Sequence, residues 1–401
     1  MDGFCKNAKV LLVHCVDTEG PIGGNVRRKP DGSQEFMDNW HDIKISLSEI
    51  TSEQFRHDNR DSLGNPFILN WFIMDFTGFK TNPKLRIEEY NDTYDNIKSL
   101  NTQKDSFHWH YHQPPASGIG DMWSDDWDSS QEHYNILGHR IIERCDFPEA
   151  YRAGGTIMDN KCSLWLEENL LVDYSNRVSH RSYPTENIFD FNWHGAPKEW
   201  GYYKPSRLDF TKKGDMKRFI VRSVDLKSRL HELEQWQVDQ AFCDAIENNK
   251  PVILSYFSHD HRDMRDETFK SIKMIKDAAK RYSVPFQWCD ALQAVQICED
   301  IVPSRVKIGI ETVNQKKLRI YFDKDIYQKS PFVYIKDNIG NIRREEVELL
   351  HVPNCPYYLK YAFVQVKEDD VKIGVACTSN TGNKSVLVET INHVKVESDY
   401  A

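Results

Sequence analysis

Short apolar runs of strand length recur over the first three quarters of this chain, and helical patterns separate most of them. The strand-like runs are Lys9–Val16, Pro66–Met74, Asp105–His112, Ala150–Arg152, Val172–Tyr174, Arg218–Val224, Pro251–Phe257 and Val284–Trp288. The helical patterns are Lys84–Leu100, Gln131–Cys145, Met158–Leu170, His231–Glu247, Asp266–Arg281 and Asp290–Cys298. Such alternation predicts an α/β domain, over residues 1–298, with a parallel sheet covered by helices. Catalytic groups of such folds gather at the carboxyl ends of the strands.

The pattern changes from about Glu299 onwards. Seven short strand-like runs follow with turns between them, and no helical pattern continues there. Asp337–Asn341 and Asn380–Asn383 have the composition of hairpin turns. We therefore predict a small all-β sandwich domain over residues 304–401.

Charge and cysteine usage exclude several classes of protein. The net charge of −9 argues against nucleic acid and against an anionic membrane surface as partners. No run of about 18 apolar residues predicts a membrane span, and Met1–Ala8 lacks the charged and apolar regions of a secretory signal. The nine cysteines are scattered without a C-x-x-C pair, which favours reduced thiols and a cytoplasmic location. The oligomeric state is not predictable from these features.

Candidate catalytic residues follow the predicted strands. In chain order they are Asp17, Glu19, His108, His110, His112, Arg152, Asp173 and His259. Two histidines and one carboxylate make an open zinc site with a position left for water, and a second carboxylate can take the proton of that water. Alternate residues of a strand face the same side, so the three histidines of the H-x-H-x-H run can converge.

This series resembles the five motifs of the polysaccharide deacetylase superfamily (NodB homology, carbohydrate esterase family 4), over roughly residues 9–298. The matching segments are Val16–Gly20, Trp109–His112, Tyr151–Gly155, Asp173 with its surroundings, and Ser258–Asp260. The resemblance implies a distorted (β/α)7 barrel, a divalent metal that is usually zinc, and removal of acetyl groups from N-acetylated sugars.

The resemblance also implies a role for each residue. Glu19, His110 and His112 would hold the metal, and Asp17, positioned by Arg152, would be the base. The usual second motif has two histidines four apart, which would be His108 and His112, but an aromatic residue just before His112 favours His110 and His112. His259, oriented by Asp173, would protonate the leaving amine. The carboxylate pair is Asp17-x-Glu19 rather than two adjacent aspartates, so the assignment of base and ligand between them stays open. The third motif has Ala153-Gly154-Gly155 in place of its usual Pro-Tyr, which leaves the oxyanion donors undetermined.

The segment that follows the histidine run is a candidate substrate loop. It contains Trp123 and Trp127, whose flat faces suit sugar rings, and His108 is a further candidate for substrate contact. The expected function is deacetylation of an N-acetylated sugar, such as a cytoplasmic precursor of a bacterial surface polysaccharide. A metal-dependent hydrolase of another small-molecule C–N bond, and a carbohydrate-binding protein with a degraded site, are the alternatives.

Overall fold

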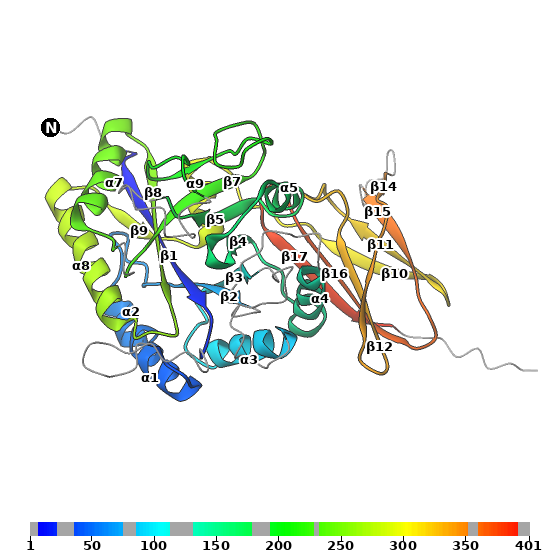
Figure 1. The fold of residues 1–401 in the computed structure, drawn as a ribbon. Helices are drawn as coiled ribbons and strands as arrows, with labels where there is room; N and C mark the ends of the chain where they lie inside the picture. The colour runs from blue at the N-terminus through cyan, green and yellow to red at the C-terminus, as the bar shows by residue number, and fades with distance from the viewer. Residues whose placement is uncertain are drawn as a thin grey trace, which may run out of the picture. The chain divides into compact units, whose positions relative to one another are not determined.

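The computed structural model describes residues 7–21, 36–74, 86–112, 131–178, 193–227, 232–351 and 360–391. Within these residues, seven parallel strands close into a barrel in the order β1-β2-β3-β4-β5-β7-β8 and back to β1 (Figure 1). Their bounds are β1 (Lys9–Thr18), β2 (Asn70–Met74), β3 (Ser106–Tyr111), β4 (Ala150–Ala153), β5 (Val172–Asn176), β7 (Phe219–Asp225) and β8 (Pro251–His259). The predicted α/β class and parallel barrel are thus confirmed.

Two further strands extend this sheet. β9 (Phe286–Trp288) pairs in parallel with the first half of β1, and the short β6 (Tyr202–Tyr203) pairs antiparallel with β7. The helices of this part of the chain are α1 (Trp40–Ile50), α2 (Glu53–Asp58), α3 (Arg86–Lys98), α5 (Asn160–Asn169), α7 (Gln235–Asn248), α8 (Arg265–Tyr282) and α9 (Ala291–Cys298).

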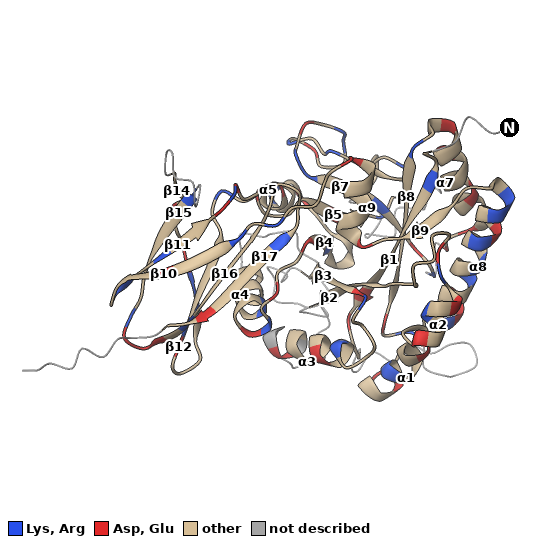
Figure 2. Ribbon diagram, turned by 180° about the vertical axis from the view of Figure 1, so that it is seen from behind, with Lys and Arg blue, Asp and Glu red and all other residues tan. Residues whose placement is uncertain are grey.

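The barrel strands are buried on both faces because one face lines the interior and the other lies under helices. Every residue of β7 is buried, and in β1 only Lys9 is partly exposed. This explains why the strands appear in the sequence as continuous apolar runs rather than as alternating patterns. Charged side chains instead lie along outer helices such as α8, where blue and red residues follow one another (Figure 2).

Helices α1 and α2 were missed by the sequence analysis, although their signals are present. In α1 the buried residues include Ile43, Leu47 and Ile50, at the spacing of one helical face. Asn39 caps its first turn by accepting from the backbone N–H of Asp42, and Ser52 caps α2 in the same way. Both helices are short and lie in a polar segment, so their few apolar residues give only a weak periodic pattern.

The C-terminal part forms two antiparallel four-stranded sheets, in the orders β10-β11-β15-β14 and β13-β12-β16-β17. Their bounds are β10 (Ile308–Asn314), β11 (Lys317–Phe322), β12 (Phe332–Asp337), β13 (Ile342–Glu345), β14 (Leu350–His351), β15 (Lys360–Gln365), β16 (Asp370–Thr378) and β17 (Lys384–Thr390). Ile320 and Val364 of one sheet share a buried core with Ile335 and Val375 of the other, so the two sheets form a sandwich. Both predicted hairpin turns are present, joining β12 to β13 and β16 to β17.

The chain divides into two compact units that do not follow the sequence order throughout. The first contains residues 1–130, 150–167 and 171–301, and the second contains 131–149, 168–170 and 302–401. Helix α4 (Glu132–Arg144) therefore belongs with the sandwich, although it lies between β3 and β4 in the sequence. Tyr334 of β12 packs against Gly138 of α4, and its hydroxyl donates to the carbonyl of Tyr134 over 2.7 Å.

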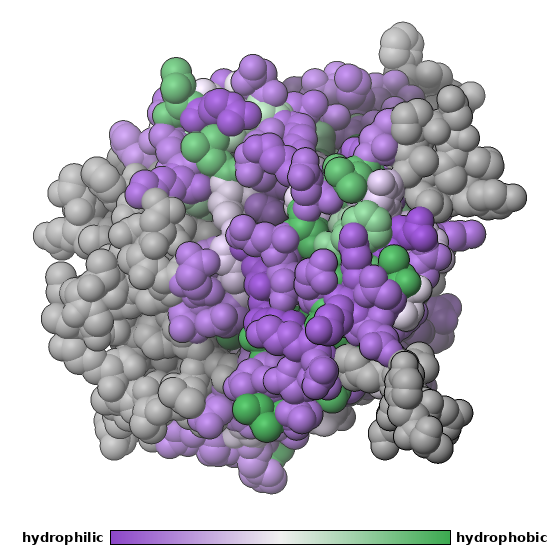
Figure 3. Space-filling model, turned by 90° about the vertical axis from the view of Figure 1, so that its right-hand side faces the viewer, coloured by the Kyte–Doolittle hydropathy of each residue, from purple (hydrophilic) through white to green (hydrophobic). Residues whose placement is uncertain are grey.

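Hydrophilic side chains predominate on the face drawn in Figure 3, where the apolar residues among the coloured atoms form small, separate groups. None of the helices in the described ranges is long and apolar enough to cross a membrane.

Candidate metal centre

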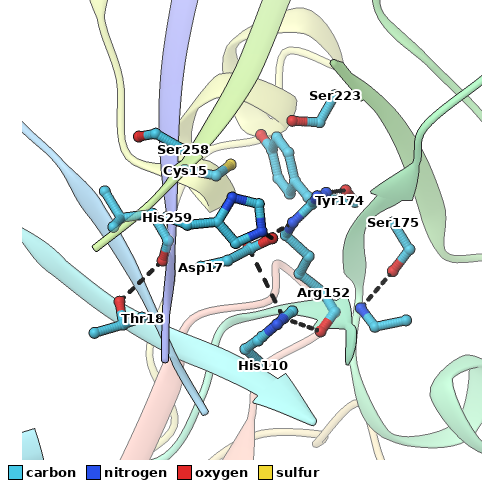
Figure 4. Close-up of polar contacts among 12 residues, drawn as sticks. Cys15, Asp17, Thr18, His110, Arg152, Tyr174, Ser175, Ser223, Ser258 and His259 are labelled. Carbon is cyan, nitrogen blue, oxygen red and sulfur yellow. Dashed lines mark hydrogen bonds and ion pairs between the residues drawn. The ribbon is translucent and has the colours of Figure 1, made fainter. Parts of the chain in front are cut away.

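The carboxyl ends of four barrel strands bring the predicted catalytic side chains together. β1 ends near Asp17 and Glu19, β3 carries His110, β4 carries Arg152, and β8 ends at His259. In the strand register, Asp17 lies beside His259 and His110 lies beside Arg152. Figure 4 shows Asp17 among the side chains of His259, Arg152 and His110.

Glu19, His110 and His112 form a buried group that can hold a metal ion. One ligand atom from each lies within 4.8 Å of the other two. The Nε2 atoms of the two histidines are 3.1 Å apart, and each lies 3.9 Å from Oε1 of Glu19. Zinc bonds of about 2.0–2.1 Å in a tetrahedral site separate the ligand atoms by roughly 3.3 Å. The three donors therefore fit a small divalent ion, and the donor set is one that zinc accepts.

The backbone fixes which nitrogen of His110 faces this group. Nδ1 of His110 lies 3.1 Å from the carbonyl oxygen of Arg152 and must donate to it. The lone pair is then on Nε2, on the side of Glu19, as in metal-binding histidines that donate their other N–H to a carbonyl. Burial lowers the pKa of His110 to about 3, which keeps the ring neutral and able to act as a ligand.

Gly154, in the segment matched to the third motif, leaves room for His112. A Cβ atom at residue 154 would stand 2.4 Å from the ring of His112 and 2.6 Å from its Cα. These distances are far inside van der Waals contact, so a larger residue here would displace the histidine.

Asp17 is held by Arg152, and its Oδ1 also lies 3.8 Å from Nδ1 of His110, the ring nitrogen that donates to the backbone. Nε of Arg152 donates to Oδ1 of Asp17 over 2.6 Å, while Nη1 donates to the carbonyl of Tyr174 over 2.6 Å. The guanidinium also lies over the ring of Phe257, 3.7 Å from its centroid. Burial raises the pKa of Asp17 above its ordinary value, although Arg152 opposes the shift.

The pKa of Glu19 is also raised, to about 8, by burial and then by the neighbouring carboxylate of Asp17. Two buried carboxylates this close repel each other when both are ionised. A divalent cation between Glu19 and the histidines would relieve that repulsion, which is a second reason why the group suits a metal.

His259 is positioned by Arg262 and not by Asp173. Nη2 of Arg262 lies 2.9 Å from Nδ1 of His259. On its other side, Nε2 of His259 lies 3.8 Å from Oδ2 of Asp17 and 3.8 Å from Oε1 of Glu19. The His259 side chain is 20 % exposed, more than Asp17 or Glu19, so it lies on the open side of the group.

Asp173 points away from the barrel interior, which corrects the predicted role as partner of His259. It accepts from the backbone N–H and hydroxyl of Ser175 and, over 3.0 Å, from Nη1 of Arg218. Arg218 in turn donates to Ser163 of α5. Neighbouring residues of a strand face opposite sides. Tyr174 turns inward towards Phe72, so Asp173 lies between the sheet and its helix layer.

Of the predicted substrate-binding residues, the described structure includes His108. His108 is fully buried against Phe72, and its Nε2 lies 3.5 Å from Oδ2 of Asp290. Trp123 and Trp127 lie outside the described residues, in the range 113–130. Substrate contact by these three residues stays a prediction.

The turn after β8 supplies Asp260, which belongs to the segment matched to the fifth motif, and His261; neither has a role assigned from the sequence. Asp260 accepts from the backbone N–H of Glu19 over 2.7 Å and of Gly20 over 3.1 Å, and so holds the loop that carries Glu19. Nδ1 of His261 lies 3.2 Å from Oε2 of Glu19. The H-D-H-R run directly after an apolar strand was the available signal, because histidines two residues apart can face the same side.

Comparison with known proteins assigns no family. No family model matches the chain, and no curated protein matches it. Solved structures that match include bovine butyrophilin, at 10% identity and a TM-score of 0.16 over 27% of this chain and 47% of that one. They also include the chitinase ChiW from Paenibacillus sp. str. FPU-7, at 10% identity and a TM-score of 0.24 over 96% of this chain and 42% of that one. The chain thus spans less than half the length of either structure, and likenesses this low carry no argument about function.

Proposed function

We propose that this protein is a metal-dependent hydrolase that removes the acetyl group of an N-acetylated sugar. The observation that supports it is the buried Glu19–His110–His112 group beside Asp17, a carboxylate that Arg152 holds over 2.6 Å. A ligand set with an open position and a separate, oriented carboxylate are the two parts that hydrolysis of an amide by an activated water requires.

Each residue has a role in this proposal. Glu19, His110 and His112 would hold the ion, which when bound lowers the pKa of a water and polarises the amide carbonyl. Asp17 takes a proton from the water as the oxygen attacks the carbonyl carbon. Arg152 keeps the Asp17 carboxylate turned towards the site. The raised pKa of Asp17 suits a group that must accept a proton near neutral pH.

The departing amine needs one proton when the C–N bond breaks, and Asp17 and His259 are the two candidates to donate it. Asp17 carries the proton that it took from the water, and Nε2 of His259 lies 3.8 Å from Oδ2 of Asp17. Acetate and the free amino sugar are the products in either case.

The two alternative functions predict different properties of the site and of the substrate. A binding protein with a degraded site would lack part of its ligand set, whereas here the three ligands lie together. A hydrolase of another C–N bond would use the same residues, so only the substrate separates it from a sugar deacetylase. A role in bacterial surface polysaccharide biosynthesis stays part of the proposal.

The test combines metal content with acetate release. Elemental analysis of the purified protein should give about one equivalent of zinc or a similar divalent ion, and His110→Ala/His112→Ala should lose it. His57→Ala, whose side chain is 62% exposed, is the matched control and should keep the metal. Acetate release is then measured with N-acetylated sugars and with non-sugar amides. A wild-type protein that binds no metal even after loading would reject the proposal.

A further inference from the structure

The contact between Arg262 and His259 determines where His259 carries its proton. A guanidinium has five N–H donors and no acceptor. Because Nη2 of Arg262 lies 2.9 Å from Nδ1 of His259, Nδ1 must accept the hydrogen bond. The neutral ring then has its hydrogen on Nε2, the nitrogen that faces Asp17 and Glu19.

Arg262 is itself fixed in place by several contacts. Nη1 donates to the carbonyl of Lys227 over 2.6 Å, and the backbone N–H of Arg262 donates to the carbonyl of His259 over 3.3 Å. Asp225 lies 3.8 Å from Nη2, and the backbone N–H of Lys227 donates to Asp225 over 3.0 Å. The guanidinium is therefore anchored between the turn after β8 and the end of β7, with the His259 ring in front of it.

This arrangement is the reverse of a carboxylate–histidine pair. A carboxylate at Nδ1 would stabilise a doubly protonated ring, as in hydrolases that use histidine for proton transfer. A guanidinium at Nδ1 opposes it, because a second proton would break the hydrogen bond and place two positive charges in contact.

The Nε2–H of His259 is not used by a neighbouring carboxylate. Its distances of 3.8 Å to Asp17 and to Glu19 are longer than a hydrogen bond. In the described structure this N–H therefore faces the candidate base and the candidate metal ligand without a hydrogen bond to either.

We propose that Arg262 is a positioning residue that fixes His259 as the Nε2–H tautomer, so that His259 donates a hydrogen bond to the oxyanion of the reacting amide. The proposal rests on the proposed function and supplies an oxyanion donor, which the departure from the third motif leaves undetermined. His259 keeps its proton throughout. The proton moves from the water to Asp17 and from Asp17 to the leaving nitrogen as the C–N bond breaks, so no further reactant is needed.

The tautomer can be measured without turnover. In ¹⁵N NMR spectra of protein labelled at histidine, a protonated and a non-protonated ring nitrogen resonate far apart, and His259→Gln assigns the signals. We expect a neutral Nε2–H ring in the wild type and in Arg262→Lys, and a mixture of tautomers in Arg262→Met. Arg265→Met is the matched control, because Arg265 pairs with Asp263 and is 38% exposed. A wild-type ring protonated at Nδ1 would overturn the inference.

The role as a donor is tested by kinetics. Removal of an oxyanion donor lowers kcat by about 10²–10³, which is the loss expected for His259→Ala. Glutamine offers an N–H donor but cannot transfer a proton, so His259→Gln should keep about tenfold more activity than His259→Ala. Equal loss in both variants would reject the donor role. A protein without any deacetylase activity would reject the proposed function instead, and the NMR result would stand.

Discussion

Arg152 donates from Nε to Oδ1 of Asp17 over 2.6 Å, and this contact separates the roles of the two carboxylates that follow β1. Asp17 pairs with the guanidinium of Arg152. Oε1 of Glu19 instead lies 3.9 Å from Nε2 of His110 and 3.9 Å from Nε2 of His112. Both carboxylates are buried. The difference in partner therefore makes Glu19 the candidate ligand and Asp17 the candidate base.

Asp17→Asn should keep the metal and lose activity. Asparagine has the shape of aspartate but cannot accept the proton of the attacking water, so kcat should fall by about 10²–10⁴. Elemental analysis and acetate release measure the two effects in the same sample. Asp58→Asn, at an exposed position, is the control. An Asp17→Asn protein with bound metal and full activity would remove Asp17 from the base role.

Gly154→Ala should weaken metal binding although it replaces none of the three proposed ligands. The added Cβ would stand 2.4 Å from the ring of His112, which must move away from Glu19 and His110. Residues that orient metal ligands typically change affinity by about 10–100-fold when altered. A competition titration with a chelator gives the zinc affinity. Gly64→Ala strains the backbone, because Gly64 has a φ of +86°, but no atom lies within 4 Å of the new Cβ, so the zinc affinity should stay unchanged. Unchanged affinity in Gly154→Ala would mean that His112 has space to shift.

Tyr334 should be important for the second unit because it joins β12 to α4. Tyr334→Phe removes the hydrogen bond to the carbonyl of Tyr134 and should lower the free energy of unfolding by about 1 kcal/mol. Tyr334→Ala also removes the ring that fills the space beside Gly138, and should lower it by about 3–5 kcal/mol. Chemical denaturation followed by circular dichroism measures both. Ile339→Ala, at a residue 81% exposed, is the control. If Tyr334→Phe and Tyr334→Ala lowered the free energy of unfolding equally, packing of the ring would contribute little to stability.

Asp146 should make the second unit sensitive to acid. Burial alone would raise the pKa of Asp146, but the ion pairs with Arg140 and Lys384 outweigh it and lower the pKa to about 2. A folded-state pKa below the unfolded value stabilises the fold above about pH 4, by about 2 kcal/mol, and this stabilisation disappears as the pH falls towards 2.

Asp146→Asn should therefore lose about 2 kcal/mol at pH 7 and show a shallower fall in stability between pH 4 and pH 2. Denaturant midpoints measured across this range test the expectation. Asp369→Asn, at an exposed position, should follow the wild-type profile. If the stability of Asp146→Asn fell with pH as steeply as that of the wild type, the acid sensitivity would come from other carboxyl groups.

Part of the candidate site could be predicted from the sequence because parallel strands end at the same edge of a barrel. Each apolar run ends in a polar residue, and these ends must come together whatever the loops do. Asp17, Glu19, His110, Arg152 and His259 were found in this way. The alternation of side chains along β3 also predicted that His108, His110 and His112 share one face. Of these, His110 and His112 lie with Glu19, whereas His108 lies beside Phe72 and Asp290.

Tertiary structure decided the contacts between those ends. Asp173 follows the same rule of strand ends, yet its side chain lies on the outer face of β5, where Arg218 and Ser175 bind it. Arg262 stands beside His259 because the turn after β8 folds back, which no periodic pattern encodes. Helix α4 belongs with the sandwich because its apolar face is buried there, and the sequence pattern does not show which surface buries it. Strand and helix periodicity is local and can be read from the sequence, whereas the partner of each buried charge is set by the packing of segments far apart in it.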